Sequence, residues 1–386
     1  MRRTPVAAVA CLAPLAALLV SCSSGSSASS SGGATGGGGG GSVTVTVAAS
    51  GDTNVQELWQ QILIPDFEKA NPGTKVNFTF DLHGTNDQQN FAKLAAATQQ
   101  GKDPGVDLLA SFTDKASSAG LLADVGSKVS NLANVDPKVV AAGGKGAIPY
   151  RASSVLLAYN PDKVATPPTT LDELLSWIQA NPGRFTYNSP KSGGSGQAFV
   201  VTVLDSKVPA PDREAMTTGY QKDLEKDWDP GWEILRGLGQ YVYQKGVYPN
   251  GNNQVLQLLS SGQIDVAPVW SDQFISGQAA GTIPKTYKVQ QIKNPSFTGG
   301  AAYLGVTKAS KQQDLAAKLA DFMLSPQEQA KIADKIAGYP AIAMSKMSPD
   351  IQAKFQAADA NNLRPGYFPD HSSDINNQWD QKVPGK

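Results

Sequence analysis

Val43-Thr44-Val45-Thr46-Val47-Ala48-Ala49-Ser50-Gly51-Asp52 is the segment from which the architecture of this 386-residue chain can be inferred. Its β-branched start predicts a strand, and the small residues at its end predict a tight loop. Helical and strand patterns then alternate: a helix from Val55 to Phe67, a strand at Lys75–Phe80, a helix at Gln88–Gln100 and a strand at Val106–Ala110. This order predicts parallel βαβ units under a helical cover.

The later part of the chain continues the mixed pattern and predicts an α/β protein. Its expected elements are a strand at Ser154–Tyr159, a helix at Leu171–Ile178 capped by Pro167–Thr170, a strand at Phe185–Tyr187, helices through Trp232–Leu238 and Gln254–Ser260, a strand at Ile264–Val269, and mostly helix from Asp314 onward. The chain from Val43 onward is too long for one comfortable core, so two lobes are expected.

The first 42 residues predict export and attachment to a membrane. Arg2 and Arg3 precede an apolar run from Val6 to Val20 that is shorter than the roughly 20 residues of a membrane span. Leu19-Val20-Ser21-Cys22 is typical of a bacterial lipoprotein processing site, so residues 1–21 are the expected signal peptide and Cys22 the lipidated residue. The alternatives are an ordinary secretory signal with an incidental Cys22, and a twin-arginine signal.

Residues 22–42 are expected to form a tether, because a tract of Ser, Gly and Ala cannot bury enough apolar surface to order itself. As a flexible coil it would hold the folded body roughly 25 Å from the lipid. The predicted location is therefore the outer face of the cell membrane.

Composition excludes several classes of function. The chain has 33 basic and 33 acidic residues, which gives no electrostatic case for binding nucleic acid. The two cysteines are Cys11 in the signal segment and Cys22, so the body has no residue for a disulfide, a thiolate metal site or a cysteine nucleophile. His83 and His371 are far apart and predict solvated surface positions, without a metal.

Several short motifs, taken in order, resemble the extracellular solute-binding proteins of ABC importers, family-1 type. They are Phe67–Gly73, Gly101–Leu108, Gly120–Asp124, Ile148–Tyr150, Ala158–Asn160, Pro168–Leu174 and Ser325–Gln329. The segment Asn181–Tyr187 is similar to a branch called YnjB-like, near the thiamine, iron and polyamine binders.

This resemblance implies a two-lobed periplasmic-binding-protein-like fold of type II, in which each lobe is a doubly wound sheet joined by hinge strands. Lobe 1 is expected to hold residues 43–153 and about 299–325, and lobe 2 residues 154–298 and about 326–386. The chain is expected to cross between the lobes near Tyr150–Ser154 and Gly299–Tyr303. The implied partners are a small-molecule solute and an ABC permease with its ATPase. The protein is expected to act as a monomer without a cofactor.

In open α/β sheets, ligands bind beyond the carboxyl ends of strands, so the loops after strands supply the candidate ligand residues. These are Ser50, Gly51 and Asp52 after the first strand, Ser111 after the third, Tyr150 and Arg151 at the lobe crossing, Ser192, Gly194, Ser195 and Gly196 in a glycine-rich loop, Trp270 and Asp272 after a later strand, and the aromatic residues Tyr303 and Tyr339. The alternatives are a helix cap at Ser50–Asp52, an interlobe salt bridge for Arg151, a mobile surface loop at Ser189–Gly196 and core packing for Trp270.

The candidate residues favour an anionic or phosphorylated organic solute. Arg151 could clamp a carboxylate or phosphate, and the glycine-rich loop before a helix could form an anion cradle. A sugar stacked on Trp270, or a polyamine held by Asp52 and Asp272, stays open.

Two other classes of protein also stay open. A surface-anchored serine hydrolase could use Ser195 with His371, although Gly193–Gln197 lacks the final glycine of a nucleophile elbow. An adhesin or sensor could use the same two-lobed fold without an importer.

Overall fold

The protein is described by a computed structural model that covers residues 42–355 and 363–384. The predicted signal peptide at residues 1–21, the lipidation site Cys22 and the tether through residue 41 lie outside the described residues. Among the residues that are described, no helix has the length and apolar character needed to cross a membrane.

The first sheet begins with three parallel strands in the order β2-β1-β3. They are β1 (Val43–Gly51), β2 (Thr74–Leu82) and β3 (Leu108–Ala110). The connection from β1 to β2 contains α1 (Thr53–Leu58), a π-helical turn (Trp59–Leu63) and α2 (Ile64–Ala70), and the connection from β2 to β3 contains α3 (Asp87–Gln99). The parallel βαβ arrangement predicted from the alternating patterns is therefore confirmed.

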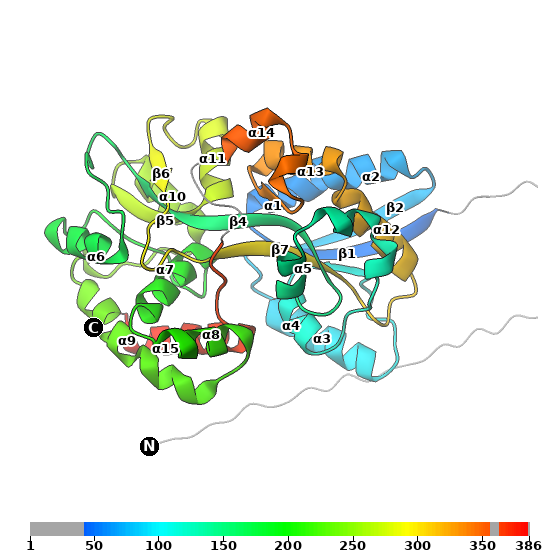
Figure 1. Ribbon diagram of the computed structural model, residues 1–386, viewed down its shortest axis with the longest axis horizontal. Coiled ribbons are helices and arrows are strands. Elements are labelled where there is room, and N and C mark those ends of the chain that lie inside the picture. The colour runs from blue at the N-terminus through cyan, green and yellow to red at the C-terminus, as the bar shows by residue number, and fades with distance from the viewer. Residues whose placement is uncertain (1–41, 356–362, 385–386) are drawn as a thin grey trace, which may run out of the picture. The chain divides into compact units, whose positions relative to one another are not determined.

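Two long strands link the two halves of the fold. The strands β4 (Ala147–Tyr159) and β7 (Gly299–Val306) pair antiparallel from Ala147 opposite Gly305 to Ser154 opposite Gly299. The far end of β7 joins β3, whereas the far end of β4 pairs with β5 (Val266–Trp270) and β6 (Lys288–Gln290). Figure 1 shows β4 and β7 running side by side between the two groups of helices. These are the hinge strands of the expected type II fold.

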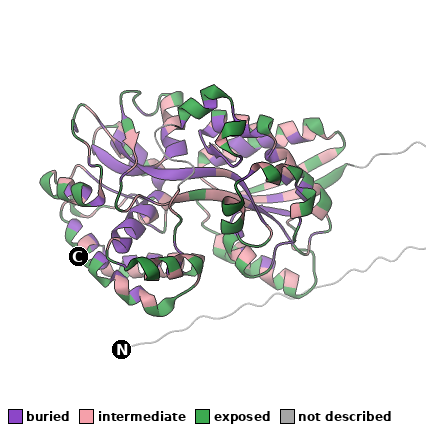
Figure 2. Cartoon of the chain, in the orientation of Figure 1, coloured by how far each residue is buried: buried purple, intermediate pink, exposed green. Residues whose placement is uncertain are grey.

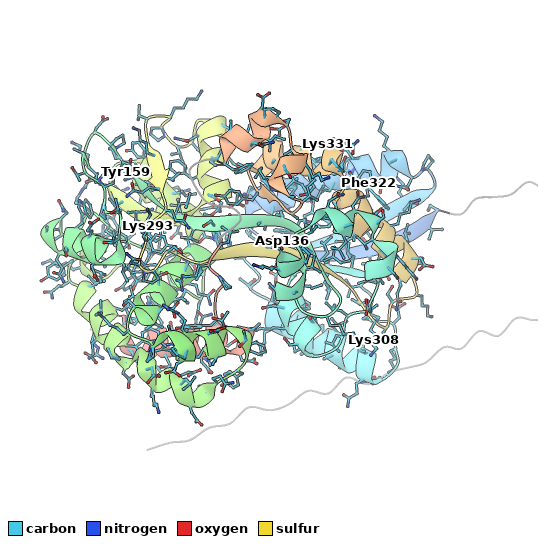
Figure 3. All side chains as sticks on the ribbon, in the orientation of Figure 1. Asp136, Tyr159, Lys293, Lys308, Phe322 and Lys331 are labelled. Atoms are coloured by element: carbon cyan, nitrogen blue, oxygen red, sulfur yellow. The ribbon has the colours of Figure 1, made fainter. Side chains whose placement is uncertain are left out.

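Each half has its own hydrophobic core. The first core contains β1, β3, α1, α2, α12 (Gln313–Met323), α13 (Pro326–Ile336) and α14 (Pro349–Lys354), and a smaller cluster with α3 and α4 (Thr113–Ser118) covers the other face of its sheet. In the first core, Phe322 of α12, which is labelled in Figure 3, packs edge-on against Phe67, with ring centroids 5.5 Å apart. The half that contains this core is called lobe 1 below.

Lobe 2 is built around the second half of β4. One face carries α6 (Leu171–Ala180), α7 (Gly194–Asp205), α9 (Asp229–Leu238) and α15 (Pro369–Lys382), and the other carries α10 (Asn252–Ser260) and α11 (Ser271–Ala280). The strand β4 is buried along nearly all of its length, and exposed residues lie on the outer helices (Figure 2). Both lobes thus have helices on both faces of a sheet, as a doubly wound fold requires.

The remaining elements are short. They are α5 (Pro137–Ala142), α8 (Ala210–Thr218), the two-residue strand β8 (Tyr339–Pro340), which pairs with β4, and 3₁₀ turns at Gly126–Lys128, Ser130–Asn134, Lys222–Trp228, Tyr243–Lys245 and Met344–Lys346.

Residues 326–355 pack differently from the sequence-based assignment, which placed them in lobe 2. The helix α13 buries Ile332 and Ile336 in the core of lobe 1. The buried Gln329 amide also donates hydrogen bonds of 2.8 Å to the carbonyl oxygens of Tyr150 and Met323, and it accepts one of 2.7 Å from the Ala341 amide. Helical periodicity shows which face of α13 is buried but not against which core. Arg364 again contacts lobe 2, since its Nε donates a hydrogen bond to the Ser296 carbonyl oxygen.

The sequence pattern predicted the start of α6 correctly, but the strand that it predicted at Phe185–Tyr187 is almost absent. Thr170 caps α6, because its Oγ1 accepts a 3.2 Å hydrogen bond from the Glu173 amide, as the sequence predicted. The expected strand at Phe185–Tyr187 is only a single bridge between Phe185 and Val266. The aromatic rings of Phe185 and Tyr187 instead pack against Phe199, so their burial comes from side-chain packing and not from a strand ladder.

Candidate functional site

A cavity of about 440 Å³ lies where lobe 1, lobe 2 and the crossing strands meet. This volume suits a small molecule. Lobe 1 contributes Ser50, Gly51, Asp52, Asn54, Val55, His83, Gly84 and Asp87; the crossing strands and the residue before β7 contribute Arg151, Ser153 and Thr298–Ala302; lobe 2 contributes Ser192, Gly193, Gly194, Asn252, Trp270, Asp272, Gln273 and Gly366.

The wall from lobe 1 forms where β1 and β2 end at the same edge of the sheet. Gly51 has a φ of 143°, and a Cβ atom added there would lie 3.3 Å from the Val55 Cβ atom, so glycine is required at this turn. Asp87, in the first turn of α3, accepts hydrogen bonds from Ser50 Oγ (3.2 Å) and Ser111 Oγ (2.6 Å). Burial raises the pKa of the Asp87 carboxyl, although the two serine hydrogen bonds oppose this shift.

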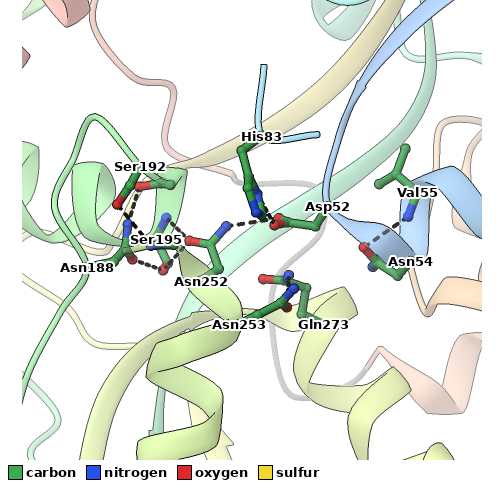
Figure 4. A network of polar contacts seen from close by, with 12 residues as sticks. Asp52, Asn54, Val55, His83, Asn188, Ser192, Ser195, Asn252, Asn253 and Gln273 are labelled. Atoms are coloured by element: carbon green, nitrogen blue, oxygen red, sulfur yellow. Dashed lines mark hydrogen bonds and ion pairs between the residues drawn. The ribbon is translucent and has the colours of Figure 1, made fainter. Parts of the chain in front are cut away.

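Asp52 is in contact with both lobes. Asn252 Nδ2, at the start of α10, donates a 2.9 Å hydrogen bond to Asp52 Oδ2 (Figure 4). His83 Nδ1 lies 2.9 Å from Asp52 Oδ1, but this oxygen accepts no hydrogen bond of normal geometry. Burial raises the pKa of Asp52, and the contacts with Asn252 and His83 partly offset the shift.

Asp272 of lobe 2 accepts a hydrogen bond from an asparagine of lobe 1, just as Asp52 of lobe 1 accepts one from an asparagine of lobe 2. Asp272 lies in the first turn of α11 in lobe 2, and its Oδ2 accepts a hydrogen bond of 3.3 Å from Asn54 Nδ2 of lobe 1. Ser153 Oγ, on β4, donates to Asp272 Oδ1 at 2.7 Å, and Arg151 Nη1 lies 3.7 Å from Oδ2. Each lobe thus supplies one aspartate and one asparagine to two reciprocal contacts, which we call the Asn–Asp clasp.

The glycine-rich loop leads into α7 at Gly194, and its first amides are already bonded within the protein. The Ser195 amide donates to Asn252 Oδ1 at 3.2 Å, and the Gly196 amide donates to Asn188 Oδ1 at 3.0 Å. Ser195 is fully buried, and its hydroxyl lies 2.8 Å from both asparagine oxygens (Figure 4). The amides at Ser195 and Gly196, which the sequence suggested for an anion, are therefore occupied by asparagine side chains.

The structure brings some of the predicted site residues to the cavity and places others elsewhere. Those that line it are Ser50, Gly51, Asp52, Arg151, Ser192, Gly194, Trp270 and Asp272. Those outside its lining are Ser111, Tyr150, Ser195, Gly196, Tyr303 and Tyr339.

Each of the residues outside the lining has a structural contact of its own. Ser111 holds Asp87, and the Tyr150 hydroxyl accepts a hydrogen bond from Arg151 Nε. The Tyr303 hydroxyl donates to the Val139 carbonyl oxygen at 2.8 Å, and burial raises the pKa of this phenol to about 12. Tyr339 lies on β8 opposite Ala152 of β4.

Sequence reasoning missed several lining residues, among them Asn54, His83, Asp87, Asn252 and Gln273. His83 follows β2 directly and Asp87 begins the next helix, so the rule that ligands lie beyond strand ends could have found them. Asn252 follows a glycine turn and not a strand, so the same rule gives no signal for it.

Of the two histidines, His83 is exposed as expected and His371 is not. His83 lines the cavity beside Asp52, whereas His371 is fully buried. His371 Nδ1 contacts Glu225 Oε1 at 2.9 Å, and Nε2 accepts a hydrogen bond from the Gln221 amide. Both nitrogens of His371 are therefore used away from Ser195, and the pair does not form the arrangement that a serine hydrolase needs.

The chain belongs to the family of bacterial extracellular solute-binding proteins, which it matches over residues 63–359. Among curated proteins, it is similar to Protein YnjB of Escherichia coli strain K12, with 26% identity over 240 residues. This region is 59% of the chain and 59% of YnjB, so the chain spans about three fifths of that relative. The similarity agrees with the branch that the motif at Asn181–Tyr187 indicated.

Solved structures share the fold. An extracellular solute-binding protein from Bordetella parapertussis superposes with a TM-score of 0.66 at 19% identity, covering 88% of this chain and 98% of its own. Maltose-bound MalE3 of T. maritima gives a TM-score of 0.67 at 16% identity, covering 86% and 92%. These superpositions support the two-lobed type II fold. The sequence identity is too low to indicate which ligand this protein binds.

The Asn–Asp clasp predicts that Asn252→Asp will shift the solute-free protein further toward its open form. The variant keeps the oxygen that faces Ser195 but places a second carboxylate against Asp52, and two such charges repel by about 1 to 4 kcal/mol. Small-angle X-ray scattering should then give a larger radius of gyration than for the unsubstituted protein. Asn253→Asp adds the same charge one residue further along α10 and should leave the radius unchanged. An equal radius for both variants would contradict the clasp.

Proposed function

We propose that this protein is the solute receptor of an ABC importer, and that it binds a small polar solute in the cavity between its lobes. The observation that carries the proposal is the composition of the cavity wall, to which both lobes and the crossing strands contribute. A solute in such a site touches both lobes at once, so it binds better to the closed form than to the open one. Solute binding then shifts the population toward the closed form, which the permease would recognise.

The chemistry of the cavity supports a polar solute. Its wall contains the carboxylates of Asp52, Asp87 and Asp272, the guanidinium of Arg151 and the amides of Asn54, Asn252 and Gln273. One large aromatic ring, that of Trp270, lines it as well. A few charged and amide groups around an apolar ring are typical of sites that orient a small hydrophilic ligand.

Lipid attachment at Cys22 completes the proposal. A receptor tethered to the outer face of the membrane stays concentrated beside the permease, which raises the rate of delivery without any new contact. A sensor of the same fold remains the second candidate, and it would bind the solute without supporting its uptake. Uptake of the bound solute should therefore be lost when the gene is deleted in the producing cell, and unchanged uptake would favour the sensor.

The attachment is tested by Cys22→Ser expressed in the cell that makes the protein. We expect the unsubstituted protein to sediment with membranes, and the variant to be released from them or to remain unprocessed, because serine has no thiol for the lipid. Ser21→Ala, which keeps a small residue before the cleavage site, serves as the control and should remain with the membranes. Membrane attachment of the Cys22→Ser protein at the mature size would contradict the anchor.

The binding function is tested by a thermal-shift screen of the purified protein against sugars, phosphorylated sugars, amines and amino acids. A solute that binds the folded state at 100 times its dissociation constant should raise the free energy of unfolding by about 2.7 kcal/mol. The same solute should have no such effect on unrelated exported proteins. If no compound from these classes raises the melting temperature, the proposal fails.

A further inference from the structure

The charges around the cavity are unbalanced in favour of carboxylates. Asp52, Asp87 and Asp272 line it, against the single guanidinium of Arg151. Arg151 lies closest to Asp272, at 3.7 Å, and its Nε donates to the Tyr150 hydroxyl. Asp87 is held by two serine hydroxyls, and Asp52 has only an asparagine amide and His83 beside it. The cavity therefore has a surplus of negative charge on the side formed by lobe 1.

One buried hydrogen-bond acceptor in the cavity wall has no donor, and a second has only a poorly aligned one. Gln273 is only 7% exposed, and its Oε1 accepts no hydrogen bond, although its Nε2 donates to Asn253 Oδ1. Asp52 Oδ1 is also buried, and its one neighbouring donor, His83 Nδ1 at 2.9 Å, does not form a hydrogen bond of normal geometry. A buried acceptor without a donor is costly to the folded state. A solute with N–H donors would remove this cost, whereas a phosphate or carboxylate would add further acceptors.

The Asn–Asp clasp shows which groups these carboxylates select. Both contacts between the lobes place the NH₂ group of an asparagine on an aspartate oxygen, at Asn252–Asp52 and at Asn54–Asp272. A protonated amine offers the same N–H donors with a full positive charge, and charge-assisted hydrogen bonds are roughly twice as strong as neutral ones. An amine that enters the open cleft can therefore take the place of an asparagine amide as the lobes close.

Trp270 adds a surface suited to the same ligand. Its ring lines the cavity, and a Cβ atom added at Gly194 would lie 2.7 Å from the ring carbon Cζ2, so glycine at this position leaves room for the tryptophan. The face of a tryptophan ring attracts a cation placed over it. An inorganic cation fits the site less well, because the described residues contain no cluster of three His, Cys, Asp or Glu side chains that could hold a metal ion.

We propose that the solute is a small organic amine whose ammonium group binds the carboxylate side of the cavity, at Asp52 and the Gln273 carbonyl oxygen. This inference rests on the proposed function, since it names the class of solute that the receptor captures. It differs from the anionic or phosphorylated solute that the sequence favoured, because the amides of Ser195 and Gly196 are occupied and the carboxylates that line the cavity outnumber the one arginine.

Isothermal titration of the purified protein with four probes tests the assignment: 1,4-diaminobutane, 4-aminobutyrate, maltose and glucose 6-phosphate. We expect a probe with an amine to bind at least about tenfold more tightly than either amine-free probe, since hydrogen bonds to a charged group change affinity by about 10- to 100-fold. The affinity for the amine should also fall as salt is added, because salt screens the attraction between charges.

The outcomes separate this inference from the function on which it rests. Tighter binding of maltose or glucose 6-phosphate than of both amines overturns the amine assignment and leaves the receptor function standing. If neither amine binds, the amine assignment is also overturned. The thermal-shift screen described above then tests the receptor function on its own.

Matched substitutions locate the ammonium group. Asp52→Asn keeps an oxygen that can accept from Asn252 but removes the charge, and it should weaken amine binding by about 10- to 100-fold. Asp87→Asn tests the same wall at a second position if the first variant does not fold. Asp223→Asn removes an exposed carboxylate outside the cavity and should leave the affinity unchanged. Equal amine affinity in all three variants would overturn the assignment of the carboxylate side.

Discussion

The site depends on one strand that belongs to both lobes. The strand β4 pairs with β7 and β8 along its first part and with β5 and β6 along its second, so both lobes are built on a single continuous segment. Because β4 is buried along nearly all of its length and pairs with strands of both lobes, it ties the two lobes together. Arg151 and Ser153 lie in the middle part of this strand and line the cavity. The hinge and the wall of the binding site are therefore formed by the same residues.

The carboxylates of the cavity are suited to binding at some cost in stability. Burial raises the pKa of both Asp52 and Asp87, so each binds its proton more readily in the folded protein than in the unfolded chain. Ionising such a group lowers the free energy of unfolding once the pH exceeds the unfolded pKa, and the loss is complete above the raised folded pKa. Above that raised pKa, the empty cavity thus holds charges that the fold would be more stable without. A solute of opposite charge compensates for them only while it is bound.

Much of the fold could be predicted from local patterns. The alternation from Val43 to Ala110 gave the order of parallel strands, and Thr170 was correctly placed as a helix cap. The lobe to which α13 belongs could not be inferred, because the buried contacts of Gln329 join residues that are distant in sequence. Tertiary packing decided that assignment.

The rule that ligands lie beyond strand ends predicted part of the cavity lining. Asp52, Trp270 and Asp272 were found in this way. Asn252 and Gln273 are defined by partners in space, and asparagine and glutamine are common enough in loops and helices that no local pattern marks them. The sequence favoured an anionic solute because the amides of Ser195 and Gly196 were expected to be free. In the structure these two amides donate to the side chains of Asn252 and Asn188, and no local pattern predicts that contact.

Closure of the lobes on a solute can be measured directly by energy transfer between two dyes. With Cys11 and Cys22 replaced by serine, the chain has no other cysteine, so Gln88→Cys on α3 and Asn250→Cys before α10 can be labelled specifically at exposed positions in the two lobes. A bound solute should shorten the distance between the dyes and narrow its distribution, because contacts with both walls favour the closed form. A distance that stays the same while the solute binds would contradict the view that the cavity between the lobes is the binding site.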